Sequence, residues 1–131
     1  MSVAAIAIGR NEGERLIKCL ASLGGAAPVI YVDSGSTDGS VEAAKAAGAE
    51  VVSLDMSIPF TAARARNEGL KRLDSLDSGC EFVQFIDGDC ELQPDWIDKA
   101  AAFLDAYPQA AVACGRRRER FPEATVYNAL C

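Results

Sequence analysis

The sequence contains no histidine among its 131 residues. This absence excludes a Ser-His-Asp triad, a Cys-His pair and a histidine-based zinc site within the chain. The five cysteines never occur with C-x-x-C spacing. An odd number of cysteines without that spacing favours reduced thiols over a disulfide framework or a zinc site. Any bound metal ion would be held mainly by oxygen atoms, which favours Mg²⁺ or Mn²⁺.

The chain also lacks an excess of basic residues and a long apolar run. Its net charge of -6 argues against general nucleic-acid binding. No window approaches the ~18 consecutive apolar residues that a membrane span requires, and the start "MSVAAIAIGRNEGE" lacks the basic lead and cleavage site of a signal peptide. We therefore expect a cytoplasmic location, which includes the inner face of the membrane.

Strand and helix patterns alternate along the chain with short connections. Apolar runs predict strands at 3–8, 28–32, 49–54, 81–86 and 110–114, and helical spacing predicts helices near 16–23, 41–47, 61–76 and 94–107. This alternation predicts an α/β fold in which a mostly parallel sheet carries helices on both faces. Ligands bind such sheets at the carboxyl ends of the strands. We expect residues 1–131 to form a single domain.

Two aspartates end the predicted strand 81–86. In "FIDGDC", Asp87 and Asp89 are two residues apart. Carboxylates held so close repel each other unless a cation or a hydrogen-bonding ligand lies between them. We therefore predict that one or both hold a divalent cation, and that Gly88 lets a ligand approach the backbone. The alternative is a solvent-exposed turn, where aspartate and glycine are common.

A polar segment, "VDSGSTDGS", follows the second predicted strand. Ser36 or Thr37 can cap the next helix, and Asp38 in its first turn suits the helix dipole, so these residues need no ligand. Asp33 is different, because an acidic residue at a strand end can bind the ribose or base of a nucleotide.

The basic residues of interest occur in two places. Arg64 and Arg66 are two residues apart on a predicted helix, which separates them by about 200°. One of them can face a phosphate or base while the other makes a surface ion pair, although both can also be solvated helix charges. The segment "GRRRER" contains Arg116, Arg117, Arg118 and Arg120. We interpret it as a solvated loop, with an anionic acceptor, a phosphate or a membrane surface as the alternatives.

Four motifs in this order resemble family 2 glycosyltransferases of the GT-A fold. The motifs are "IAIGRNEGERLIKCLASL", "VDSGSTDGS", "ARARNEGL" and "FIDGDCEL", and the resemblance covers roughly residues 3–115. It implies a Rossmann-like nucleotide-binding half-domain. It also implies transfer of a sugar, usually with inversion, from a nucleotide diphosphate to an acceptor hydroxyl.

The resemblance also implies a role for individual residues. A UDP-sugar would be the donor, and Mn²⁺ or Mg²⁺ would bridge its diphosphate. The residues that would contact the nucleotide are Arg10, Asn11, Glu12, Asp33, Arg66 and Asp87. Asp33 would contact the base, and Asp87 would contact the ribose or the metal. Asp89 would coordinate the metal.

Family domains are longer than this chain, and their general base normally lies in the second half. The resemblance therefore implies a nucleotide-binding half that lacks the acceptor-binding half, is inactive alone and can self-associate through uncovered apolar surface. The sequence identifies neither the acceptor nor the base. Three alternatives remain open: a non-catalytic nucleotide-sugar-binding module, a magnesium-dependent phosphotransferase of the haloacid dehalogenase type, and a dinucleotide oxidoreductase. "AIGRNEG" lacks the glycine pattern of the last class.

Overall fold

A computed structural model of the chain describes residues 2–130 and contains one four-stranded sheet. The strands are β1 (Val3–Gly9), β2 (Val29–Asp33), β3 (Glu50–Ser53) and β4 (Phe82–Asp87). Their order across the sheet is β3-β2-β1-β4, and all neighbouring strands are parallel. The helices are α1 (Glu14–Ala21), α2 (Ser40–Ala46), α3 (Ala62–Ser75), α4 (Trp96–Ala106) and α5 (Val126–Ala129).

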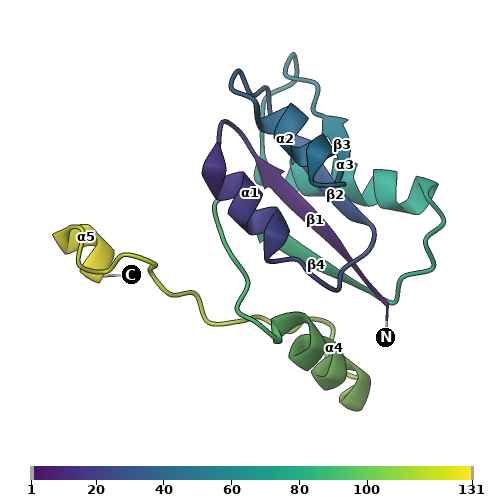
Figure 1. Ribbon diagram of the computed structural model, residues 1–131. Coiled ribbons are helices and arrows are strands. Elements are labelled where there is room, and N and C mark those ends of the chain that lie inside the picture. Colours follow the sequence, from purple (N-terminus) through teal and green to yellow (C-terminus); the bar gives the residue numbers. More distant parts are fainter. Residues whose placement is uncertain (1, 131) are drawn as a thin grey trace.

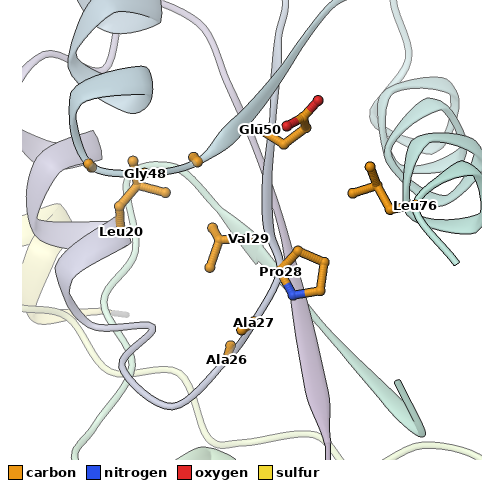
Figure 2. A pocket seen from close by; sticks show the side chains of 10 residues that line it. Leu20, Ala26, Ala27, Pro28, Val29, Gly48, Glu50 and Leu76 are labelled. Atoms are coloured by element: carbon orange, nitrogen blue, oxygen red, sulfur yellow. The ribbon is translucent and has the colours of Figure 1, made fainter. Parts of the chain in front are cut away.

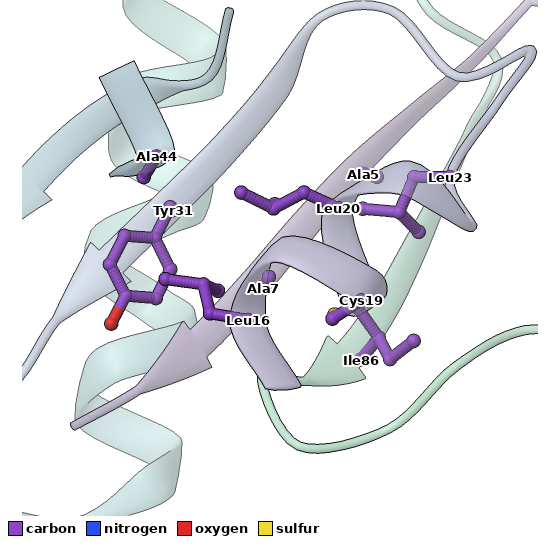
Figure 3. Packing of buried hydrophobic residues seen from close by; sticks show 9 residues of the cluster. All are labelled: Ala5, Ala7, Leu16, Cys19, Leu20, Leu23, Tyr31, Ala44 and Ile86. Carbon is purple, nitrogen blue, oxygen red and sulfur yellow. The ribbon is translucent and has the colours of Figure 1, made fainter. Parts of the chain in front are cut away.

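Helices cover both faces of the sheet, as the strand-helix alternation predicts (Figure 1). The side chains of β1 are buried on both faces because they alternate between two apolar clusters. On one face, Leu16 and Cys19 of α1 lie over Ala7 and next to Tyr31 and Ile86 (Figure 3). On the other face, α3 covers a second cluster of buried residues, Ala4, Ile6, Ile8, Ile30, Val32, Leu54, Ala65 and Leu73.

A glycine allows α3 to lie close to the sheet. A Cβ atom at Gly69 would lie 2.6 Å from Cγ2 of Ile6 and 3.1 Å from Cγ2 of Val32. Glycine is a poor helix former, and at this position its cost is offset by the close approach of helix and sheet. The close contact brings α3, the helix that carries Arg66, directly against the sheet.

The predicted fifth strand is wrong. Residues 110–114 form no strand, and the side chain of Val112 is 71% exposed. Its composition is not the reason, because β1 also contains three alanines; an apolar run pairs only where the chain passes beside an edge strand. Within residues 2–130, β4 pairs only with β1. The chain instead runs on from α4 to α5, away from the sheet (Figure 1).

Helix α4 lies near the amino ends of β1 and β4. Ile97 and Ala101 of α4 form a small apolar cluster with Val3. Several large apolar side chains on and after this helix stay exposed, among them Phe103, Tyr107, Val112 and Phe121. Self-association through such surface stays a prediction. None of the helices in residues 2–130 is long and apolar enough to cross a membrane.

Candidate nucleotide site at the strand ends

The sequence-predicted residues gather where the carboxyl ends of β1 and β4 meet. The order β3-β2-β1-β4 reverses its direction between β1 and β4, and ligands of open α/β sheets bind at such a point. Ile8 of β1 pairs with Asp87 of β4, and the Gly88 amide donates to the Ile8 carbonyl at 2.7 Å. A Cβ atom at Gly88 would lie 3.1 Å from that carbonyl oxygen. Glycine therefore lets the turn after β4 close onto β1.

Arg66 is the arginine that reaches this edge. Its Nη2 atom lies 2.9 Å from Oδ1 of Asp87, and both side chains are partly exposed. Arg64 points elsewhere, because its Nη2 donates to the carbonyl oxygens of Asp55 and Ile58 at 2.9 Å each. The two arginines thus serve different parts of the molecule, as their helical spacing predicts. Arg64 holds the loop before α3 and makes no surface ion pair among the described residues.

Acidic side chains lie close together around Glu12 and Asp89. Glu12 forms an ion pair with Arg15 at 2.8 Å. Burial is the main cause that raises the pKa of Glu12, Arg15 opposes the rise, and the carboxylates of Asp89, Asp38 and Asp87 add to it. The carboxylate of Asp89 is exposed and forms no ion pair with a basic residue among residues 2–130. The site therefore holds more negative charge than its own arginines neutralise.

Asp33 lies at the end of β2 and is only 3% exposed. Its Oδ1 accepts from the Tyr31 hydroxyl at 2.9 Å and the Ser36 hydroxyl at 2.5 Å, and its Oδ2 accepts from the Ser36 amide at 2.8 Å. Burial and then the hydrogen bond to Asp33 raise the pKa of Tyr31. Both carboxylate oxygens thus have partners inside the protein, and the predicted contact with a base stays a prediction.

Asn11 joins the loop after β1 to the loop after β2. Its backbone is in the left-handed region with φ 51°. Its amide donates to Ser36 Oγ at 2.9 Å, and its Oδ1 accepts from the amides of Thr37 and Asp38 at 2.7 and 3.3 Å. The neighbouring Arg10 is exposed directly after β1.

The prediction that Ser36 or Thr37 caps α2 is wrong. Gly39 occupies the N-cap position and makes no side-chain capping bond. The Ser36 hydroxyl is used by Asp33, and Asp38 accepts instead from the amide of Ser40 at 3.0 Å. The loop is therefore held by bonds among its own polar side chains.

Sequence reasoning missed Tyr31 and Arg120. Tyr31 precedes Asp33 by two residues, so the strand period places both side chains on one face of the sheet. The sequence pattern predicts Tyr31 only as part of the strand 28–32. Arg120 belongs to the segment that we interpreted as a solvated loop, and it donates to the carbonyl oxygen of Asp89 at 3.0 Å. The sequence offers no signal for that contact, because the residues are 31 positions apart.

A hollow at the opposite end of the sheet is a poorer candidate. It has a volume of about 320 Å³ and is lined by residues such as Leu20, Pro28 and Gly48 (Figure 2). The charged residue in its lining, Glu50, is already paired with Arg72 of α3. The hollow lies at the amino ends of the strands and brings together no unpaired charged groups.

The carboxylate oxygens of Asp87 and Asp89 fit a cation that binds together with a phosphate. The described residues contain no cluster of three or more acidic, cysteine or histidine side chains placed to hold a metal ion. Asp87 has one oxygen committed to Arg66, which leaves its second oxygen and the carboxylate of Asp89. Mg²⁺ sites commonly use one or two carboxylates and complete the coordination with substrate phosphates and water. The two aspartates would therefore supply part of the coordination of the ion, and a phosphate and water would supply the rest.

The sheet order, the glycine-closed turn and the carboxylates beside Arg66 define a Rossmann-like α/β domain with a ligand site at its strand ends. The family model for glycosyl transferase family 2 matches residues 5–129. The chain therefore belongs to glycosyl transferase family 2. This match places the chain outside the haloacid dehalogenase phosphotransferases, which the sequence analysis left open as an alternative.

Solved structures resemble the chain over most of its length. S. aureus TarS 1-349 matches with a TM-score of 0.68 and 23% identity, covering 94% of this chain and 40% of that one. Glucosyl-3-phosphoglycerate synthase from Mycobacterium tuberculosis, in complex with Mn²⁺, UDP and glucosyl-3-phosphoglycerate, matches with a TM-score of 0.57 and 27% identity. The second match covers 79% of this chain and 39% of that one. The chain thus spans about two fifths of the length of either neighbour.

Proposed function

We propose that these residues form the donor-binding part of an enzyme that transfers a sugar from a UDP-sugar to an acceptor hydroxyl, with inversion. The observation that carries the proposal is the ion pair of Arg66 and Asp87 at the point where the sheet reverses its order. Beside it lies Asp89, whose carboxylate has no basic partner within residues 2–130. Membership of the family and the synthase structure with UDP and Mn²⁺ support the choice of donor. We assign no general base and no acceptor.

Each residue has a distinct task in this proposal. Asp89 and the free oxygen of Asp87 would hold Mn²⁺ or Mg²⁺. A bound ion supplies positive charge that stabilises the departing diphosphate. Arg66 donates to the nucleotide and keeps one oxygen of Asp87 in place. The loop around Arg10 and Glu12 borders the nucleotide.

Asp33 is the proposed residue whose oxygens are already used by the protein. Since its oxygens accept three hydrogen bonds inside the protein, a base would have to share one of them or bind the backbone nearby. A carboxylate oxygen has more than one lone pair, so sharing is possible. We keep Asp33 as the proposed contact to the base, held in position by Tyr31 and Ser36.

Calorimetry with UDP tests the proposal. We expect wild type to bind UDP with Mn²⁺ and to lose this binding with a chelator. Asp89→Ala should weaken binding by about 100-fold or more, because even outer-shell substitutions cost 10–100-fold at metal sites. Asp105→Ala is the control, since Asp105 is an exposed aspartate on α4. Equal binding in the presence of chelator, or an unchanged affinity in the Asp89 variant, would refute the proposal.

A further inference from the structure

The arginine at the end of the basic segment contacts the acidic turn after β4. Nη2 of Arg120 donates to the carbonyl oxygen of Asp89 at 3.0 Å, and its Nη1 lies 3.2 Å from Oε1 of Glu91. The Arg120 and Glu91 side chains are 32% and 36% exposed. One guanidinium group therefore bridges two residues of the turn, which matches the forked geometry of arginine donors.

The far end of the turn is held at the C-terminal end of α1, because the Leu92 amide donates to Ser22 Oγ at 3.0 Å. The Cys90 amide donates to the Asp87 carbonyl at 2.9 Å, and the Gly88 amide bonds to β1. These bonds fix the start of the turn. Between these points no helix or strand supports Asp89, and among the described residues its carboxylate accepts only from the Cys90 thiol of the same turn, at 3.5 Å. The direction of the Asp89 side chain therefore depends on how the backbone from Asp89 to Glu91 is held. Arg120 bonds to that backbone.

The rest of the basic segment lies nearby. A Cβ atom at Gly115 would lie 3.3 Å from the Trp96 ring, so the chain after α4 returns to the start of that helix. Figure 1 shows this return before the chain continues to α5. Arg120 reaches the turn from this segment, and the interpretation of the segment as a solvated loop is wrong for this residue.

We propose that Arg120 is a positioning residue, which holds the Asp89–Glu91 turn so that the Asp89 carboxylate faces the site of the cation and the diphosphate. This inference rests on the proposed function. The alternative is that Arg120 contributes only its charge. The two possibilities predict opposite signs, because a positive charge near a cation site opposes cation binding by Coulomb repulsion.

Removal of the side chain distinguishes them. If Arg120 positions the turn, Arg120→Ala should weaken Mn²⁺ binding by about 10-fold or more, as expected for a residue that orients a metal ligand. If only charge matters, the same substitution should tighten Mn²⁺ binding. Arg118→Ala is the matched control, because it removes the same charge from an exposed neighbour in the same segment.

The experiment is a Mn²⁺ titration of the chain at saturating UDP, followed through the electron paramagnetic resonance signal of the free ion. We expect Arg120→Ala to need about 10-fold more Mn²⁺, Arg120→Lys to recover part of the loss, and Arg118→Ala to stay within about twofold of wild type. Glu91→Gln breaks the ion pair but also removes a negative charge, so the Arg120 variants alone decide between the two possibilities.

Two results would be decisive in different ways. Equal or tighter Mn²⁺ binding by Arg120→Ala would overturn the positioning role while leaving the proposed function intact. A wild-type chain that shows no Mn²⁺-dependent binding of UDP would overturn the proposed function itself.

Discussion

Replacing Arg66 with alanine separates a contribution to ligand binding from a contribution to folding. Arg66 Nη2 lies 2.9 Å from Asp87 Oδ1, and the two side chains are 38% and 49% exposed. Ion pairs with that exposure contribute about 0.2–1 kcal/mol, because solvent screens the charges. We therefore expect Arg66→Ala to lower the free energy of unfolding by no more than about 1 kcal/mol.

The expected effect on UDP binding is larger. A hydrogen bond to a charged group contributes about 1.5–3 kcal/mol. With about 1.4 kcal/mol for each factor of ten, the loss of one arginine contact with the diphosphate corresponds to about 10–150-fold in Kd. The substitution also leaves Asp87 without its cationic partner, which adds to the repulsion of the diphosphate.

The same helix provides a matched control. Arg72 of α3 forms an ion pair with Glu50, and these side chains are 43% and 40% exposed, but the pair lies away from the site. Urea denaturation should give similar small losses of stability for Arg66→Ala and Arg72→Ala. Calorimetry with UDP and Mn²⁺ should show weaker binding only for Arg66→Ala. If that variant binds UDP within about twofold of wild type, the reasoning is refuted.

Substitutions at Gly69 and Tyr31 test the packing and the hydrogen bonding beneath the site. Gly69→Ala should destabilise the chain in urea by about 1–3 kcal/mol, since the new methyl group would lie 2.6 Å from Ile6. Gly24→Ala, with open space around it, should cause no loss, so equal stability of the two variants would contradict the packing argument. Tyr31→Phe removes the hydrogen bond to Asp33 and should cost about 1.5–3 kcal/mol in thermal unfolding, whereas a loss below about 0.5 kcal/mol would contradict it.

The sheet could be predicted from the sequence because its strands are continuous apolar runs. The residues of β1 are buried on both faces, which is the pattern expected for a parallel strand between two layers of helices. The segment 110–114 carries a similar apolar run and still forms no strand. An apolar run shows that residues can pair with a sheet, but the pairing also requires a position beside the edge strand. That requirement is a property of the whole fold.

The candidate site could be predicted only in part. Strand ends that carry Asp33, Asp87 and Asp89 follow from the alternation of elements, because parallel strands bring their carboxyl ends to one edge. The choice between Arg64 and Arg66 depends on how α3 is rotated against the sheet. The helical period predicts that the two side chains point in different directions, but it does not predict which one faces the site. That rotation is set by the contact at Gly69.

The polar residues of the site divide into two groups with different physical consequences. Asp33 and Asn11 are satisfied by hydrogen bonds within the loops after β1 and β2, so those loops are held in place before a ligand arrives. Such preorganisation lowers the entropic cost of binding. Asp87 and Asp89 are only partly satisfied, and their charges help to raise the pKa of Glu12. In the proposed function a bound cation would relieve this repulsion, and so we expect the nucleotide to bind more tightly with its metal than alone.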